Sequence, residues 1–310
     1  MPDETARAVR FDSYGDRHVL YVANIEMPTP APGEVVVGVR AAGINPGEIS
    51  IRRGLLRDRL PSTFPSGQGS DLAGVVTRIG VGVETFGVGD EVLGFSWTRS
   101  SQATHVAVPV DQLIRKPREL SWEVAGSLYV AGCTAYAAVR AVDPQEGDVV
   151  AVSAAAGGVG SIVVQLLRIK GANVLGIASD ANAAWLNDHG AVAVPYGDDL
   201  AARLRSAAPD GIDAFIDLFG PEYLQLAVDL GIDPSRIETI ISFEKAQEIG
   251  AKADGSATAS TPEVLTELAG LAAAGAIEIP IADTYPLDRV ADAYEELERR
   301  HTRGKIVLVP

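Results

Sequence analysis

A glycine-rich turn in the middle of the chain has the composition of a phosphate-binding site. Ala155, Gly157 and Gly160 take the three places of a G-x-G-x-x-G pattern, with alanine in the first place, and Gly158 and Val159 lie between the last two. Glycine lets backbone N–H groups approach a pyrophosphate closely, and a helix that begins at such a turn adds the positive end of its dipole. We interpret these five residues as a cradle for the pyrophosphate of a dinucleotide.

The segments on either side of this turn predict the elements that must position it. Residues 149–152 are apolar, mainly β-branched and uncharged, which is typical of a strand buried on both faces. From residue 161 to 170 apolar residues recur at a helical period, Gly171 is a stop signal, and residues 173–177 begin a second apolar strand. This pattern predicts a doubly wound parallel sheet of the Rossmann type.

Two other interpretations of the same segment have weaker support. A tight turn between a strand and a helix needs no ligand, and a glycine triplet alone is a weak signal for one. Residues 149–167 carry no charge, as a membrane span would, but the glycine run and the change of period argue against a span.

Composition restricts the class of protein. The chain has 310 residues, enough for two domains, with 47% hydrophobic and 22% charged residues, so we expect a soluble globular protein. A formal net charge of -15 makes nucleic acid and anionic membranes poor partners. The N-terminus has no apolar segment typical of a signal peptide, and the single cysteine, Cys133, cannot form a disulfide within the chain. These features fit a cytoplasmic protein.

The first 120 residues predict a second kind of module. Short apolar runs such as residues 35–40 and 73–79 alternate with turns rich in glycine and proline, and no long helical period interrupts them. We expect an all-β module here, distinct from the α/β unit downstream.

The glycine turn, residues 154–160 with Gln165 after it, is similar to the cofactor turn of the zinc-free quinone oxidoreductases. This is the zeta-crystallin-like branch of the medium-chain dehydrogenase/reductase superfamily. The resemblance extends along nearly the whole chain, in the segments AGINP (42–46), GSDLAGVV (69–76), GDEV (89–92), GCTAY (132–136) and GKIVL (304–308). It implies a GroES-like β-barrel domain that holds the substrate, built from residues 1–120 and 258–310, with a Rossmann dinucleotide-binding domain at 121–257 inserted in it.

The resemblance also implies which residues contact the cofactor. Beyond the glycine turn, Ser179 and Asn182 follow the second strand, and other candidates lie farther along the chain: Asn45 and Thr134 beside the nicotinamide, Tyr196 near the adenosine phosphate, and Phe219, Ser242, Phe243 and Lys305. Ser242 and Phe243 are expected at the end of a strand over residues 236–243. Taken alone, Asn45 before Pro46 is more typical of a turn residue, and the surrounding matches favour the role beside the nicotinamide.

The choice of nucleotide depends on the end of the second strand. Enzymes that use NAD place Asp or Glu there to hold the ribose 2′-hydroxyl, and in this chain the place falls on Ala178. A small neutral residue followed by Ser179 suits a 2′-phosphate, whereas Asp180 and the missing Lys or Arg do not. We predict NADP(H), with NAD(H) as the alternative.

We expect no zinc site. A catalytic zinc needs about three Cys, His or carboxylate ligands and a structural one typically four cysteines. One cysteine excludes the second, and the four histidines, at positions 18, 105, 189 and 301, form no cluster with ligand spacing. At the positions that hold ligands in zinc-dependent relatives the chain has Asn45 or its neighbours, Ser70 and Val130.

The segment 51–59 holds four arginines in an otherwise acidic chain. We expect an exposed loop, either solvated or in contact with an anionic substrate group, and the substrate-side candidates are Ser50, Arg52 and Arg57. Ser50 and Leu56 stand where relatives often have polar residues, and Glu48 where Asp is common. No side chain presents itself as the proton donor.

These observations predict a zinc-independent NADP(H)-dependent oxidoreductase that transfers a hydride to a quinone or an α,β-unsaturated carbonyl compound. Two alternatives are an enoyl reductase of a biosynthetic pathway and a nucleotide-binding sensor or structural protein without turnover. Relatives commonly dimerise, so we expect a homodimer acting on a small molecule.

Overall fold

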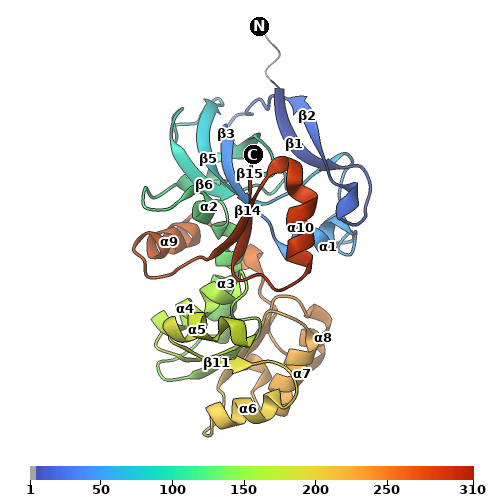
Figure 1. Ribbon diagram of the computed structural model, residues 1–310. Coiled ribbons are helices and arrows are strands. Elements are labelled where there is room, and N and C mark those ends of the chain that lie inside the picture. Colours follow the sequence, from blue (N-terminus) through green and yellow to red (C-terminus); the bar gives the residue numbers. More distant parts are fainter. Residues whose placement is uncertain (1–4) are drawn as a thin grey trace. The chain divides into compact units, whose positions relative to one another are not determined.

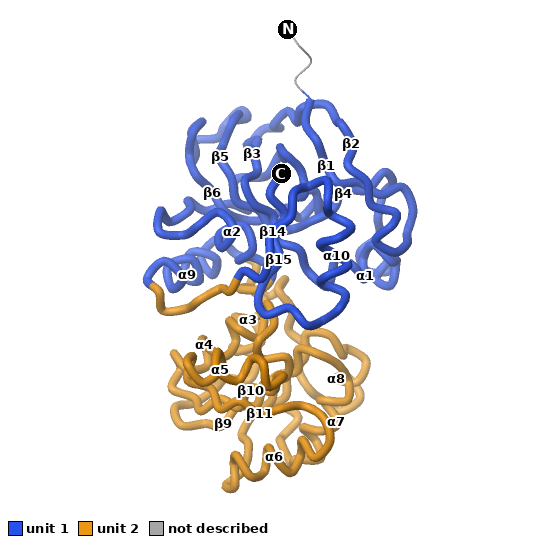
Figure 2. Tube along the Cα trace, in the orientation of Figure 1, with its two compact units in different colours: residues 1–130, 261–274, 281–310 blue, residues 131–260, 275–280 orange. Residues whose placement is uncertain are grey.

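The computed structural model describes residues 5–310 and divides into two compact units, shown in different colours in Figure 2. Unit 1 comprises residues 1–130, 261–274 and 281–310, and unit 2 comprises residues 131–260 and 275–280. Residues 1–4, part of the N-terminus in which we expect no signal peptide, lie outside the described residues.

Unit 2 is built on a five-stranded sheet in which every neighbouring pair is parallel. In spatial order its strands are β11 (Ala191–Pro195), β10 (Asn173–Ala178), β9 (Val149–Val152), β12 (Ala214–Asp217) and β13 (Ile237–Thr239). The chain extends the sheet to one side of β9 and then returns to extend it on the other side, so the winding reverses next to β9. The predicted doubly wound parallel sheet is confirmed.

Helices cover this sheet because its strands are apolar on both faces. They are α4 (Gly160–Ile169), α5 (Ala183–Asp188), α6 (Leu200–Ala207), α7 (Pro221–Asp229) and α8 (Phe243–Ile249), and α3 (Leu128–Val142) leads into the unit from unit 1. Ala151 and Phe215 of the sheet share a buried core with Leu204 of α6, Leu224 of α7 and Ala246 of α8. Helices α4 and α5 pack against β9, β10 and β11.

The strand expected over residues 236–243 is wrong beyond Thr239. Strand β13 ends there because the Thr239 hydroxyl accepts the N–H groups of Ile241 and Ser242, at 3.3 and 3.1 Å, which turns the chain out of the sheet. Phe243 is therefore the first residue of α8.

Unit 1 contains two sheets (Figure 1). The larger one has the order β14 (Ile281–Pro286), β15 (Lys305–Val309), β3 (Glu34–Gly43), β5 (Asp71–Ile79), β6 (Glu91–Phe95) and β8 (Leu113–Arg115), with β7 (His105–Pro109) also paired to β3. The smaller one has the order β2 (Tyr21–Glu26), β1 (Thr5–Phe11) and β4 (Ser66–Gly67). Strand β15, from the end of the chain, pairs with β3, so unit 1 joins distant stretches of sequence within one sheet.

Among the described residues, four α-helices lie wholly within unit 1: α1 (Pro46–Arg52), α2 (Trp122–Ala125), α9 (Pro262–Ala273) and α10 (Val290–Glu298). Helix α10 packs against α1 and β15. The pattern of residues 123–129, with Ser121 before it as a possible cap, predicts one helix there, and this prediction is wrong, because α2 ends at Ala125 and α3 begins at Leu128. Gly126 interrupts it because its backbone lies against β3, where a Cβ atom would come within 2.5 Å of the Ala41 carbonyl oxygen.

Among the helices of residues 5–310, none has both the length and the apolar character needed to cross a membrane.

Candidate cofactor and active site

The glycine turn joins the carboxyl end of β9 to the start of α4. Ala154 adopts a left-handed conformation with φ of 47°, and Gly160 begins the helix. A Cβ atom on Gly160 would lie 2.2 Å from the Ala154 carbonyl oxygen and 2.8 Å from the Ala155 Cα atom. Only glycine therefore lets α4 begin this close to the turn, as the third place of the dinucleotide pattern requires.

The structure brings all five predicted turn residues together. Ala155 and Gly160 are buried, whereas Gly157, Gly158 and Val159 are partly exposed at the start of α4. Helix α4 is 10 residues long, so its amino end carries a developed partial positive charge. An anionic group placed over residues 157–159 would meet backbone rather than charged side chains, which fits a pyrophosphate.

A buried carboxylate that the sequence did not single out joins three strand ends beneath this turn. Asp217 ends β12, and its Oδ1 atom accepts the Ser153 hydroxyl at 2.9 Å, while its Oδ2 atom accepts the Thr239 hydroxyl at 2.8 Å. Ser153 follows β9 and Thr239 ends β13. Asp217 thus fixes the carboxyl ends of β9, β12 and β13 at the point where the winding of the sheet reverses, which is where such sheets bind ligands.

Two predicted cofactor residues belong to the same cluster. The Phe219 N–H donates to Asp217 Oδ1 at 2.9 Å, and the Ser242 hydroxyl donates to Asp217 Oδ2 at 3.2 Å. Ser242 is buried, and its hydroxyl bonds within the protein. Phe219 and Phe243 are instead exposed, at 37% and 39%. These two rings give the carboxyl edge of the sheet an apolar surface.

The residues predicted near the adenosine lie at the ends of β10 and β11. Ser179 follows β10, and its hydroxyl accepts the Asn182 side-chain N–H at 3.1 Å. Tyr196 follows β11, and its N–H donates to the Ala178 carbonyl at 3.2 Å, which places it beside the end of β10. Its side chain is 52% exposed.

Arg203 on α6 fixes the segment that carries Tyr196. Its guanidinium donates to the backbone carbonyls of Pro195 and Gly197, at 3.0 and 3.3 Å, and to that of Asp198. This positive charge lies near the end of β11, but Asp180 is exposed after the end of β10. The sequence did not indicate Arg203, because its partners are backbone atoms that no side-chain pattern reveals.

In unit 1, Asn45 precedes α1 and has both ends of its side-chain amide engaged. Its Nδ2 atom donates to Asp71 Oδ2 at 2.6 Å and to Glu48 Oε1 at 3.3 Å, and its Oδ1 atom accepts from Lys305 Nζ at 2.5 Å. Asn45 is 4% exposed. Carboxylates on one side and an ammonium on the other fix the orientation of this amide.

The predicted residue Lys305 is also buried, and it faces the same cluster. Besides Asn45 it donates to the Ile44 carbonyl at 3.1 Å. Burial raises the pKa of Asp71, which the Lys305 charge opposes, and burial lowers the pKa of Lys305, which Asp71 opposes. Asp71 is held in turn by the Val130 N–H at 2.9 Å. Thr134, the other predicted nicotinamide residue, lies on α3 in unit 2 and is 7% exposed.

The expectation that Arg52 is exposed on a loop is wrong. It is the last residue of α1 and 0% exposed, because it lies one helical turn after Glu48 on the buried face of the helix. Its guanidinium pairs with Glu298 at 3.4 Å. Ser50, on the same helix, is partly exposed, and Arg57, in the following loop, is exposed, so the structure does not bring the three substrate-side candidates to one surface.

Within residues 5–310, no group of three or more His, Cys, Asp or Glu side chains is placed to hold a metal ion. Ser70 is partly exposed, and its N–H donates to Glu48 Oε1 at 3.2 Å.

Two family models match the chain. The alcohol dehydrogenase GroES-like domain matches residues 31–142, and the zinc-binding dehydrogenase model matches residues 189–308. The first match confirms the expected GroES-like domain in the N-terminal part of the chain.

Full-length comparisons agree with these matches. The chain is 28% identical over 334 residues to the chloroplast envelope quinone oxidoreductase homolog of Arabidopsis thaliana, covering 100% of both chains. It is 29% identical over 331 residues to the quinone oxidoreductase of Salmonella typhimurium, covering 98% of this chain and 100% of the relative. Among solved structures, the quinone oxidoreductase from Coxiella burnetii is 30% identical with a TM-score of 0.87, covering 99% of this chain and 100% of that one.

Proposed function

The chain belongs to the quinone oxidoreductase-like proteins of the medium-chain dehydrogenase/reductase superfamily, and from this premise we propose that it transfers a hydride from NADPH to a quinone or an α,β-unsaturated carbonyl compound without zinc. The observation that carries the proposal is the turn between β9 and α4: Gly160 permits the close start of the helix, and Ser153, just before the turn, donates its hydroxyl to the buried Asp217. The quinone acceptor is suggested by the relatives named above.

Each part of the chain then has a defined task. The backbone of residues 157–159 binds the pyrophosphate, and Ser179, Asn182 and Tyr196 contact the adenosine side. Asn45 and Thr134 orient the nicotinamide ring, which supplies the hydride when the cofactor is bound. Solvent provides the proton, since no exposed acid is indicated as its donor. Residues 1–120 and 258–310 hold the substrate, and residues 121–257 hold the nucleotide.

The proposal is tested by NADPH oxidation with a panel of quinones and a panel of enones. Turnover with at least one panel is expected. Gly158→Asp is the matched control, because a carboxylate against the pyrophosphate should abolish NADPH binding while thermal unfolding shows that the variant is folded. NADPH binding without turnover on either panel would indicate a nucleotide sensor, and turnover restricted to enoyl thioesters would indicate an enoyl reductase.

We also propose that the protein acts as a cytoplasmic homodimer. Light scattering after size-exclusion chromatography measures the oligomeric state, and a monomer at micromolar concentration would contradict it. Fractionation of cells that express the protein tests the location.

A further inference from the structure

Glu48 is the acceptor for an unusual number of buried hydrogen bonds. The carboxylate is 5% exposed and accepts from the Asn45 N–H at 3.0 Å, the Asn45 Nδ2 atom at 3.3 Å, the Ser70 N–H at 3.2 Å, the Gln102 Nε2 atom at 3.3 Å and the Tyr294 hydroxyl at 2.5 Å. A carboxylate has about four lone-pair sites, so all of its acceptor capacity is used. Glu48 therefore cannot rotate without leaving several buried donors unpaired.

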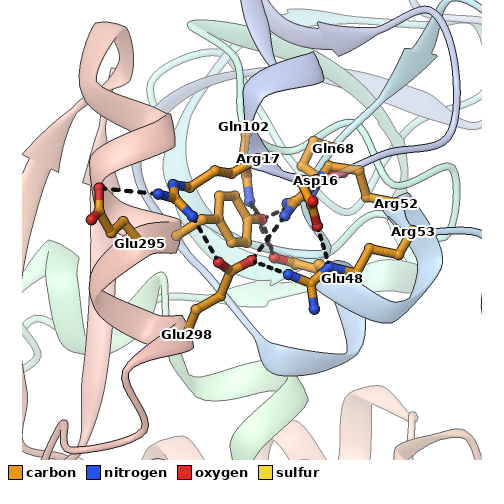
Figure 3. A network of polar contacts seen from close by, with 10 residues as sticks. Asp16, Arg17, Glu48, Arg52, Arg53, Gln68, Gln102, Glu295 and Glu298 are labelled. Atoms are coloured by element: carbon orange, nitrogen blue, oxygen red, sulfur yellow. Dashed lines mark hydrogen bonds and ion pairs between the residues drawn. The ribbon is translucent and has the colours of Figure 1, made fainter.

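Tyr294 supplies the shortest of these bonds from a distant part of the chain. It lies on α10 with 0% exposure, and its hydroxyl donates to Glu48 while it accepts from Gln68 Nε2 at 2.9 Å and Gln102 Nε2 at 2.8 Å. The hydroxyl thus uses its one donor and both of its acceptor sites. Figure 3 shows Gln68 and Gln102 converging on this point above Glu48.

A second contact fixes the Tyr294 ring. The Arg52 guanidinium lies 4.7 Å from the centroid of this ring and pairs with Glu298 on the same helix. Glu298 also pairs with Arg17 and Arg53, at 3.2 Å each, so α10 is tied to α1 by a network of charged groups (Figure 3). The Arg52 guanidinium thus fixes the ring of Tyr294, and Gln68 and Gln102 fix its hydroxyl, so the hydroxyl is held against Glu48.

We propose that Tyr294 is a positioning residue that acts through Glu48 to orient the Asn45 amide. The inference rests on the proposed function, in which Asn45 lies beside the nicotinamide. Asn45 contacts Glu48 through both its backbone N–H and its side-chain Nδ2 atom, so a displaced carboxylate would release the residue at two points. Asp71 and Lys305 would then hold the amide alone.

A double-mutant cycle tests this chain of contacts, because two residues that act through one pathway are not additive. NADPH affinity is measured by fluorescence titration for the wild type, Tyr294→Phe, Asn45→Ala and the double variant. Adenosine 2′,5′-bisphosphate, which lacks the nicotinamide, is the reference ligand. Tyr294→Phe is expected to weaken NADPH binding about tenfold, the loss of one hydrogen bond to a charged group, without changing affinity for the reference ligand.

In the Asn45→Ala background, Tyr294→Phe should change NADPH affinity by less than about twofold. An equal loss in both backgrounds would overturn the proposal, because the effect would then be structural. If Tyr294→Phe does not fold, Glu48→Gln replaces it in the same cycle, since this change keeps the volume of the side chain. Glu48→Gln should likewise weaken NADPH binding in the wild type and change it by less than about twofold in the Asn45→Ala background.

Tyr285→Phe is the matched control. Tyr285 also donates its hydroxyl to a glutamate, Glu296, within unit 1, and neither residue is among the partners of Glu48, Tyr294 and Asn45 named above. It should change NADPH affinity by less than about twofold. A wild type that binds NADPH but reduces no acceptor would contradict only the proposed reaction, whereas a wild type that binds no NADPH would overturn both.

Discussion

The Ser153 hydroxyl donates to Asp217 Oδ1 at 2.9 Å and thereby joins the carboxyl ends of β9 and β12. The same hydroxyl accepts the Leu218 N–H at 2.8 Å, so the pair also fixes the segment that leaves β12. These two strands flank the place where the winding of the sheet reverses. The pair thus stabilises the edge of the sheet over which the glycine turn lies.

Asp217→Asn should lower the free energy of unfolding by about 2 kcal/mol or more. The amide NH2 group of asparagine cannot accept a hydrogen bond. In place of one carboxylate oxygen it would leave buried donors, such as the Thr239 and Ser242 hydroxyls, without an acceptor. Urea unfolding measures the loss. Asp213→Asn is the control, because Asp213 precedes the same strand and accepts the Val149 N–H in a more exposed setting, and its change should cost less than about 1 kcal/mol. Equal losses in the two variants would contradict the claim that the buried hydrogen bonds of Asp217 stabilise the fold more than the exposed bond of Asp213.

Most of the elements that were predicted correctly in unit 2 follow from local sequence patterns. The strand, turn and helix around Gly157 are specified by neighbouring residues, so β9, α4 and β10 were predicted to within about two residues. The end of β13 was missed because a side chain, Thr239, bonds the N–H groups that would have continued the strand.

The polar networks could not be predicted because they depend on pairs far apart in the chain. Asp217 and Tyr294 look like ordinary members of a strand and a helix, and only the fold brings Tyr294 to Glu48, 246 positions away. Arg52 was placed on a loop because a run of arginines is usually solvated. Its burial requires Glu298 and the Tyr294 ring, which the local sequence does not contain.

Stability should depend on the ionisation of Glu238. This residue of β13 is 0% exposed, and its Oε1 atom accepts the Asp254 N–H at 2.7 Å. Burial raises its pKa to about 8; the hydrogen bond from the Asp254 N–H opposes this shift, the Asp254 charge adds to it, and the Lys252 charge opposes it. Because the pKa is higher in the folded state than its ordinary value of 4.5, the folded protein binds the extra proton between these values. Stability from this group is therefore lost as the pH rises from about 4.5 to about 8.

Glu238→Gln should remove this loss, which is on the order of 5 kcal/mol across the interval. Urea unfolding at a series of pH values compares the variant with the wild type, with Glu244→Gln on the exposed side of α8 as control. A difference between Glu238→Gln and the wild type that does not grow with pH would show that Glu238 is ionised throughout.

Asp180→Arg should shift the nucleotide preference toward NADPH. The side chain follows β10, where a guanidinium would meet a 2′-phosphate, and a well-formed contact of this kind contributes about 1.5–3 kcal/mol. The ratio of the dissociation constants for NADPH and NADH measures the change. Asp188→Arg, the same charge change on α5, should leave the ratio unaltered. An unchanged ratio in both variants would place the selectivity elsewhere.

The exposed arginines after α1 should affect anionic acceptors more than stability. Arg57 and Arg59 lie in the exposed loop, where charges contribute about 0–1 kcal/mol to folding. Changing both to Ser should raise the KM for an anionic acceptor, leave a neutral quinone and the Tm nearly unchanged, and weaken the salt dependence of the anionic reaction. Equal effects on both acceptors would refute electrostatic attraction, and no effect on either would identify a solvated loop.

The most direct test of the proposed reaction follows deuterium from the reactive position of the nicotinamide of NADPH into a reduced enone, using protein treated with a chelator and analysed for metal. Hydride transfer without zinc predicts NADPH consumption with a quinone or an enone, carbon-bound deuterium in the product wherever an enone is reduced, and undiminished rates in protein that contains no stoichiometric zinc. NADPH consumption with neither acceptor, or activity that disappears with the metal and returns with about one zinc per chain, would contradict the account.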